Sequence, residues 1–307
     1  MSKATGFKYR GKLRPGRLSP TRRVPKTIPR PDYAEDGVPK DKRPRFPWSI
    51  EIKTPEQIQG MRYACRTARE VLDIAGRAVA PGIRTDDIDR IVHEESIRRG
   101  GYPSTLNYQG FKKSCCTSLN EVICHGIPDS TKLKEGDIIN IDITVFIGGF
   151  HGDCSETYLV GEVDEEGRRL VKTTWECMEK GIGICKPGTH IKEIGNVIEE
   201  FAKKNGYSIP TGFVGHGIGS SFHMLPNVPH YKNNEPAGKM KPGMTFTIEP
   251  MVNEGKRDYI FWEDEWTATT SDGKRSAQFE HTLLITEDGV ERLTGKIESS
   301  PKYFWEL

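Results

Sequence analysis

Two stretches of this chain repeat one order of helices, stops and strands at nearly constant spacing. Each predicts two helices separated by a Pro-Gly stop, which is Pro81-Gly82 in the first stretch and Pro187-Gly188 in the second, 106 residues later. A shift of 107 residues takes Asp142, on a predicted strand, onto Glu249. Helix pairs are common, but near-equal shifts for helices and strands favour a duplication. A duplicated helix–helix–strand unit predicts an α+β fold whose strands form one curved antiparallel sheet.

The helices of both repeats have clear start and stop signals. Residues 54–57 supply a Thr N-cap, a Pro at the first helical position and a Gln that completes a capping box. Apolar residues then recur at steps of three and four, as on one face of a long helix. A second helix is expected from Thr85 to Gly100-Gly101, and the second repeat predicts helices that end at Pro187-Gly188 and at Asn205-Gly206.

The strand signals follow each helix pair. Residues 139–147 and 244–248 alternate mainly apolar with polar side chains, which is typical of strands with one buried face. Gly148-Gly149 is a two-residue hairpin signal. We therefore expect Ile147 to pair with Phe150 across the turn.

Two carboxylates meet on the polar face of this predicted hairpin. In the expected register Asp142 lies opposite Ser155, and Asp153 is its diagonal neighbour, roughly 7–8 Å away at the backbone. Such a pair repels unless it is exposed or shares a cation. Exposure is the commoner meaning of an Asp pair on a hairpin, but aromatic neighbours and the second repeat would cover much of this face.

The second repeat offers further metal-binding groups. Glu249 precedes a proline, Glu280 stands among apolar and β-branched residues, and His216 lies in a Gly-His-Gly segment that leaves its imidazole accessible. Four carboxylates and one imidazole suit Mn²⁺, Fe²⁺, Co²⁺ or Zn²⁺, and the number of carboxylates favours two ions with shared ligands. Each residue alone is more often structural, so the hypothesis of a dinuclear site depends on the whole set.

The charge of the chain is unevenly distributed. Residues 1–50 hold 14 Lys/Arg, 4 Asp/Glu and 8 of the 20 Pro, while the remainder is acidic. We therefore divide the chain into a basic, Pro-rich N-terminal extension or linker (1–50), expected to be extended and poorly packed, and an acidic domain (51–307) that holds the candidate metal site. A mitochondrial transit peptide would be Ser-rich and amphipathic, whereas Pro residues interrupt this segment.

The sequence lacks the signals of membrane, secreted, disulfide-rich and zinc-finger proteins. The sequence has no apolar run long enough to span a membrane and no signal-peptide core. The 7 Cys include no CxxC pair, so neither a disulfide framework nor a zinc finger is indicated. We expect Cys115 and Cys116 to be free thiols in a reducing compartment, which is consistent with a cytoplasmic protein. His93, on a helix rich in charged residues, is expected at the surface.

Six segments resemble those of type 1 methionine aminopeptidases, from about Thr54 to the C-terminus. They are Asn120-Glu121-Val122-Ile123-Cys124-His125-Gly126-Ile127-Pro128, Asn140-Ile141-Asp142-Ile143, Phe150-His151-Gly152-Asp153, Gly215-His216-Gly217-Ile218-Gly219, Thr247-Ile248-Glu249-Pro250-Met251 and Gln278-Phe279-Glu280-His281-Thr282. The resemblance implies the pita-bread fold of the M24 metallopeptidases. It also implies co-translational removal of the initiator methionine from nascent polypeptides with a small second residue.

The resemblance also implies roles for the site residues. Asp142 and Asp153 would hold one divalent ion, His216 and Glu249 the other, and Asp153 and Glu280 would bridge the pair. A water between the two ions would attack the first peptide bond, and Glu249 would pass its proton to the leaving amine. His125 and His223 would act with Glu249 in catalysis. His125 would contact the substrate amide nitrogen, and His223 would hydrogen-bond the scissile amide.

Family positions imply a substrate pocket and a third ion. The methionine side chain would lie against Tyr108, Cys116, Phe222 and Trp266. Phe111 and Thr105 stand where some relatives have Tyr and Cys, which changes the pocket's shape without removing activity. A monovalent cation, Na⁺ or K⁺, is implied near Asn120, Val122 and Ser276.

The extension from Tyr9 to Tyr33 looks like the linker of eukaryotic cytosolic members, which usually carry a zinc-finger region that this sequence lacks. Its basic charge is compatible with contact to the ribosome or to RNA, although such basic segments are more often solvated linkers.

Three other classes of protein fit this sequence less well. A proline-specific peptidase of this fold would need a larger N-terminal domain, and a type 2 enzyme would need a helical insertion between His216 and Glu249, where only 32 residues lie. A non-enzymatic relative would be expected to lose metal ligands, and all five are present.

Overall fold

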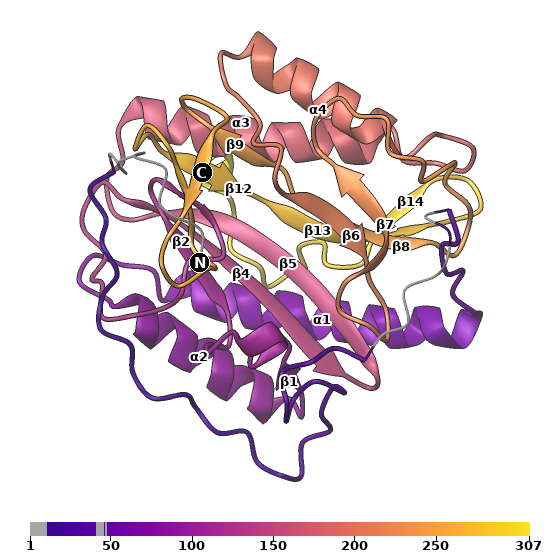
Figure 1. Ribbon diagram of the computed structural model, residues 1–307, viewed down its shortest axis with the longest axis horizontal. Coiled ribbons are helices and arrows are strands. Elements are labelled where there is room, and N and C mark those ends of the chain that lie inside the picture. Colours follow the sequence, from indigo (N-terminus) through magenta and orange to yellow (C-terminus); the bar gives the residue numbers. More distant parts are fainter. Residues whose placement is uncertain (1–10, 41–45, 47) are drawn as a thin grey trace.

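The computed structural model describes residues 11–40, 46 and 48–307. Within these residues the two predicted helix pairs are present, and Figure 1 shows them at opposite ends of one sheet. The first pair is α1 (Pro55–Arg77) and α2 (Thr85–Arg98), and the second is α3 (Glu165–Gly183) and α4 (Glu193–Lys204). The capping box of α1 is confirmed by reciprocal hydrogen bonds between Thr54 and Gln57.

The strands between and after these helices pair antiparallel throughout. The main sheet has the order β1-β4-β5-β13-β8-β6-β7, with β2 on β4 and β14 on β13. Its strands are β1 (Tyr102–Pro103), β2 (Cys116–Leu119), β4 (Ile138–Ile147), β5 (Phe150–Leu159), β6 (Val214–Gly217), β7 (Met224–Pro229), β8 (Thr245–Ile248), β13 (Glu280–Ile285) and β14 (Val290–Arg292). The predicted α+β class and curved antiparallel sheet are confirmed.

Two smaller sheets, which the prediction of a single sheet omitted, lie beside the main one. One joins β10 (Tyr259–Phe261), β11 (Ala268–Thr270) and β3 (Val122–Cys124), and the other joins β12 (Ser276–Gln278) and β9 (Met251–Asn253). Short 3₁₀ turns, η1 (Tyr108–Gly110) and η2 (Phe304–Glu306), complete the described elements.

The β4–β5 hairpin has the predicted register. Ile147 pairs with Phe150 and Asp142 with Ser155. Gly148 and Gly149 have φ of 62° and 85°, the left-handed backbone that a tight two-residue hairpin turn requires. The predicted register therefore correctly identifies which side chains of this hairpin share a face.

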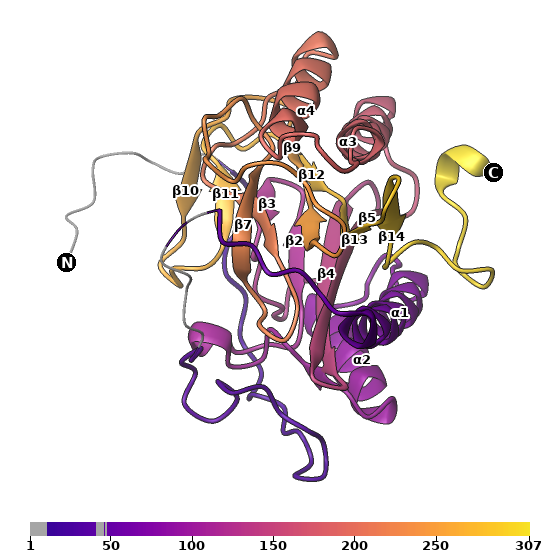
Figure 2. The ribbon, with the colours of Figure 1, turned by 90° about the vertical axis from the view of Figure 1, so that its right-hand side faces the viewer.

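The two helix pairs cover the same side of the curved sheet, as Figure 2 shows. The buried Ile and Val residues of β4 pack in one core with α1 and α2. A second core contains the apolar faces of α3 and α4 with β8 and β13. Because side chains alternate along a strand, Asp142 and Thr144 face the opposite side of the sheet, away from the helices. That side carries the candidate site.

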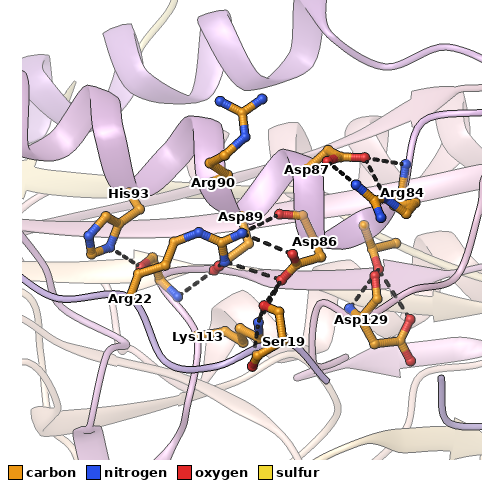
Figure 3. Close-up of polar contacts among 12 residues, drawn as sticks. Ser19, Arg22, Arg84, Asp86, Asp87, Asp89, Arg90, His93, Lys113 and Asp129 are labelled. Carbon is orange, nitrogen blue, oxygen red and sulfur yellow. Dashed lines mark hydrogen bonds and ion pairs between the residues drawn. The ribbon is translucent and has the colours of Figure 1, made fainter. Parts of the chain in front are cut away.

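Residues 11–40, here called the strap, contain no helix or strand, as expected of an extended segment, but they pack along the body of the protein, so the prediction of poor packing is wrong for them. Figure 3 shows Arg22 of the strap bonded to both Asp86 and Asp89 of α2. Lys12 and Leu13 donate their backbone N–H groups to Glu121, at 2.6 and 2.8 Å. The prediction missed these contacts because the partners of a period-free segment lie far away in sequence. Residues 1–10 of the extension lie outside the described residues, as do 41–45 and 47.

His93 is also not where the sequence placed it. It is buried at 5% exposure, and its ring nitrogens lie 2.8 Å from Ser114 Oγ and 3.1 Å from the backbone oxygen of Arg23. The strap covers a helix face that would otherwise be exposed, which explains the error.

All seven cysteines, Cys115 and Cys116 included, are free and buried, so the prediction of free thiols is confirmed. In the described part of the chain, no helix is long and apolar enough to cross a membrane.

Candidate metal centre and substrate pocket

A cavity of about 530 Å³ opens on the face of the sheet opposite the helices. All five predicted metal-binding residues line it: Asp142, Asp153, His216, Glu249 and Glu280. The first two come from the first repeat and the other three from the second, so the site lies where the two halves meet. Neither repeat could form this set alone.

Strand register explains why these side chains converge. Ser155 of β5 is the backbone partner of Asp142 on β4 and also of Glu280 on β13. Asp142 and Glu280 are therefore aligned across three adjacent strands, and Asp153 is two residues from their shared partner on the same face. On β6, His216 is next to Gly217, which pairs with Phe246 of β8, and Glu249 directly follows this strand.

The ligand-type atoms are close together. One atom each of Asp153, His216 and Glu280 lie within 4.8 Å of one another. His216 Nε2 is 3.6 Å from Asp153 Oδ2 and 3.6 Å from Glu249 Oε1. Its other ring nitrogen, Nδ1, lies 3.0 Å from the carbonyl oxygen of Gly217. A carbonyl can only accept, so Nδ1 carries the proton and Nε2 offers its lone pair to the carboxylate cluster.

The negative charges of the buried carboxylates are not balanced by the protein groups around them. Burial, together with the negative charges of its neighbours, raises the pKa of both Asp142 and Glu280 well above the usual range. Burial raises the pKa of Glu249 to about 7. Although burial opposes protonation of His216, the carboxylates of Asp153 and Glu249 raise its pKa. Such a set is stabilised by divalent cations, and its oxygen-rich donors with one imidazole fit them.

Several residues that orient these carboxylates escaped the sequence interpretation. Thr144 donates to Asp153 Oδ1 at 2.8 Å, and Thr247 donates to Glu249 Oε1 at 2.8 Å. The backbone N–H of Glu249 donates to Nε2 of the buried His230 at 3.0 Å. Thr144 and Thr247 each stand near an acidic residue on the same strand face, a pattern that could have indicated them. No sequence pattern indicated His230, whose contact with Glu249 arises only from tertiary packing.

The predicted substrate residues line the same cavity: Tyr108, Cys116, His125, Phe222, His223 and Trp266. His125 has a φ of 56°, a left-handed conformation that non-glycine residues seldom adopt and that often marks functional sites. Burial lowers its pKa to about 4, so its imidazole is neutral at pH 7. His223 and His216 have ring centroids 4.2 Å apart, which places His223 beside the metal-binding cluster.

Phe111 and Thr105, the two departures from family positions, also line the cavity. Phe111 contacts the edge of Trp266 at a centroid distance of 5.2 Å. Phe111 and Trp266 therefore add a second aromatic pair to the cavity lining, besides Tyr108 and Phe222.

The three residues predicted for a monovalent cation lie outside the cavity lining. Asn120 has a φ of 47°, and its backbone oxygen accepts from the N–H of Ser276 at 2.8 Å. Ser276 Oγ is buried without a hydrogen-bond partner. Val122 is on β3, next to this contact. The monovalent site stays a prediction.

Comparison with known proteins identifies the class to which this fold and site belong. Residues 59–287 match the metallopeptidase family M24. Methionine aminopeptidase 1A of Arabidopsis thaliana is 56% identical over 97% of this chain and 75% of its own length. Methionine aminopeptidase 1 of Saccharomyces cerevisiae is 52% identical over 96% of this chain and 77% of its own length. The crystal structure of a methionine aminopeptidase from Rickettsia prowazekii matches with a TM-score of 0.78 and 43% identity, covering 80% of this chain and 100% of the other.

The chain therefore belongs to metallopeptidase family M24 and has its pita-bread fold. Within that family it groups with the methionine aminopeptidases, as its resemblance to the type 1 members predicted. It is a metal-dependent aminopeptidase hydrolase.

Proposed function

We propose that this protein removes the initiator methionine from new polypeptides whose second residue is small. The observation that carries the proposal is the cavity itself, which combines a floor of buried carboxylates with an aromatic wall. The carboxylates can hold metal ions at the scissile bond, while the wall can hold one methionine side chain.

Five residues would hold two divalent ions: Asp142, Asp153, His216, Glu249 and Glu280. The set suits Co²⁺, Mn²⁺, Fe²⁺ or Zn²⁺. When bound, such ions supply a water nucleophile near neutral pH. Asp153 and Glu280 would be the ligands shared by both ions, a proposal supported by their closeness, since their ligand atoms and that of His216 lie within 4.8 Å of one another.

Three side chains would handle the proton and the peptide. Glu249 would accept the proton of the attacking water and pass it to the leaving amine, because its carboxylate lies beside His216 at the edge of the acidic cluster. Neutral His125 would contact the amide nitrogen of the substrate, and His223 would donate to the scissile amide as charge develops on its oxygen. Burial excludes much of the water that would weaken these contacts.

A peptide hydrolysis assay tests this function. After chelation the protein should release no methionine from a Met-Gly peptide, and activity should return with separately added Co²⁺, Mn²⁺, Fe²⁺ or Zn²⁺. A Met-Leu peptide should be cleaved far more slowly, because the space beyond the scissile bond must accept only a small side chain. Turnover without metal, or equal rates on the two peptides, would contradict the proposal.

We also propose that the protein acts co-translationally in the cytoplasm and meets the ribosome through its basic extension. Arg23, Lys26 and Arg30 of the strap line a cavity of about 630 Å³ together with Lys112 of the body. This cluster of cations favours the phosphate backbone of RNA as a partner. A bound Na⁺ or K⁺ near Asn120, Val122 and Ser276 remains part of the same proposal.

A further inference from the structure

The pocket residue Tyr108 is carried by a loop with an unusual backbone. The residues on either side of it, Asn107 and Gln109, have φ of 64° and 48°. Side chains other than glycine seldom occupy this left-handed region, and such residues persist only where the surroundings hold them. Residues 105–111, here called the pocket loop, therefore need external contacts to keep Tyr108 in place.

The strap supplies those contacts. Ala34 accepts a hydrogen bond from Asn107 Nδ2 at 3.1 Å, and Gly37 accepts one from the backbone N–H of Gln109 at 2.9 Å. Gly37 has a φ of 77°, and a Cβ at this position would lie 3.2 Å from the carbonyl oxygen of Asn107. The strap and the pocket loop thus fit closely, and both strained residues of the loop are tied to strap backbone.

Tyr33 of the strap is at the centre of this contact. Its side chain is buried at 2% exposure, and its hydroxyl donates to the carbonyl oxygen of Ser104 at 2.6 Å. The edge of one ring meets the face of the other between Tyr33 and Tyr108, with centroids 4.9 Å apart. This arrangement is favourable for aromatic pairs, so Tyr33 restricts the orientation of the Tyr108 ring.

The aromatic contacts continue into the site. Tyr108 lies 4.8 Å from Phe222 and 4.9 Å from His223 between ring centroids. On its other side, Tyr33 stacks on His151 at 6.3 Å, and His151 stacks on Phe222 at 5.3 Å. Tyr33 therefore supports both Tyr108 and Phe222, the two aromatic residues beside His223.

We propose that Tyr33 is a positioning residue for the substrate pocket, and that the strap from Tyr33 to Gly37 is a working part of the active site. It touches no reacting atom. It acts by holding the pocket loop, so that Tyr108 and Phe222 present a preformed wall to the methionine side chain. The inference deepens the proposed function and rests on it.

The test uses the full chain with Tyr33→Ala and Tyr33→Phe. We expect Tyr33→Ala to raise KM for a Met-Gly peptide about three- to tenfold, the range that corresponds to one aromatic pair, with a smaller change in kcat. Hydrogen exchange at residues 107–111 should quicken, while metal content stays unchanged. Tyr33→Phe keeps the ring contact and should remain within about twofold of the wild type.

Matched variants separate positioning from general loosening of the chain. Leu13→Ala removes a strap side chain that packs against the α1–α2 core, and it should leave KM unchanged. If Tyr33→Ala folds poorly, Asn107→Gly provides a second test, because glycine accepts the left-handed backbone but loses the bond to Ala34. In a Tyr108→Ala background, Tyr33→Ala should add little.

Three results would overturn the inference: unchanged KM in Tyr33→Ala, equal losses in Tyr33→Ala and Tyr33→Phe, or a loss in Leu13→Ala as large as in Tyr33→Ala. The wild-type protein distinguishes these from failure of the proposed function. If the wild type releases no methionine with any metal, the proposed function itself fails.

Discussion

At the scale of single residues, the site depends on charges that the protein does not balance by itself. Glu280 and Asp142 are buried among other carboxylates, and none of the Lys or Arg residues that the structure describes lines their cavity. Threonine hydroxyls and the backbone N–H bonded to His230 fix the orientation of Asp153 and Glu249. Orientation is thus supplied by the protein, while neutralisation is left to bound cations.

Replacing Glu280 with Gln tests whether the charge of this carboxylate is needed to bind cations. Glu280→Gln keeps the size of the side chain and removes the charge, so we expect peptide hydrolysis to fall at least about a hundredfold even with excess metal. Metal titration by calorimetry should show weaker binding. Glu235→Gln, on the exposed surface, is the matched control and should behave as wild type. Near-normal turnover by Glu280→Gln would remove Glu280 from the metal-binding set.

Glu249 gives a prediction for pH. Its pKa is raised from 4.5 to about 7 by burial, so between these values the chelated native state holds a proton that the unfolded chain releases. The free energy of unfolding of the chelated protein should therefore fall as pH rises from 4.5 to 7, by on the order of a few kcal/mol. Although burial opposes the shift, hydrogen bonds from Arg22 and Lys113 hold the pKa of Asp86 well below its usual range, so this group affects stability only at more acidic pH.

Urea unfolding of chelated wild type and Glu249→Gln at several pH values checks this. The fall should be smaller in Glu249→Gln, and bound metal should reverse it, since ions prefer the deprotonated ligand. Parallel pH profiles for the two chelated proteins would contradict the raised pKa.

At the scale of elements, the strap is attached by a buried ion pair. Asp89 has a side chain only 1% exposed, and Arg22 of the strap is its ion-pair partner while also bonding Asp86. The same aspartate accepts from the backbone N–H of Ser114, which joins α2 to the segment before β2. Figure 3 shows how Ser19 and Lys113 complete this cluster around Asp86.

Removing the charge of Arg22 should destabilise the folded protein. Arg22→Ala leaves Asp89 buried without its cation, and we expect it to lower the free energy of unfolding by about 3 kcal/mol. Arg23→Ala, the exposed neighbour on the same strap, should change it by less than about 0.5 kcal/mol. Asp89→Asn added to Arg22→Ala should restore part of the loss. Equal urea midpoints for Arg22→Ala and Arg23→Ala would show that the pair does not hold the strap.

At the scale of the whole molecule, two repeats with separate cores share one site. The first core packs α1 and α2 against β4, and the second packs α3 and α4 against β8 and β13. The proposed metal-binding residues come from both repeats, so bound ions would connect the halves and stabilise the native state by mass action. Residues 11–40 lie against the first repeat, and Tyr33 of this strap contacts Tyr108, which lines the shared cavity.

The basic surface of the strap gives a prediction at this scale. Arg23→Glu with Lys26→Glu should weaken binding to ribosomal RNA at least about tenfold and flatten its salt dependence, because fewer counterions are released. Lys239→Glu with Lys241→Glu makes the same charge change on exposed residues of the second repeat and should have little effect. Peptide hydrolysis serves as the measure of folding. Unchanged RNA affinity in the strap variant would disprove this contact.

By itself, the sequence determined the features that depend on local periodicity and turn chemistry. The capping box at Thr54, the Pro-Gly stops and the Gly148-Gly149 turn identified the helices and the β4–β5 register. Because side chains alternate on a strand, that register also placed Asp142 and Asp153 on one face. The duplication and the family segments then indicated which residues of the second repeat would join them.

Only the tertiary structure decided how distant segments meet. The burial of His93, the support of Glu249 by His230 and the contact of Tyr33 with Tyr108 join residues 19 to 75 positions apart. These contacts leave no periodic signal, since each depends on how whole elements pack rather than on local preference. For the same reason residues 11–40, which belong to a basic, Pro-rich segment typical of a loose linker, pack here against the rest of the protein.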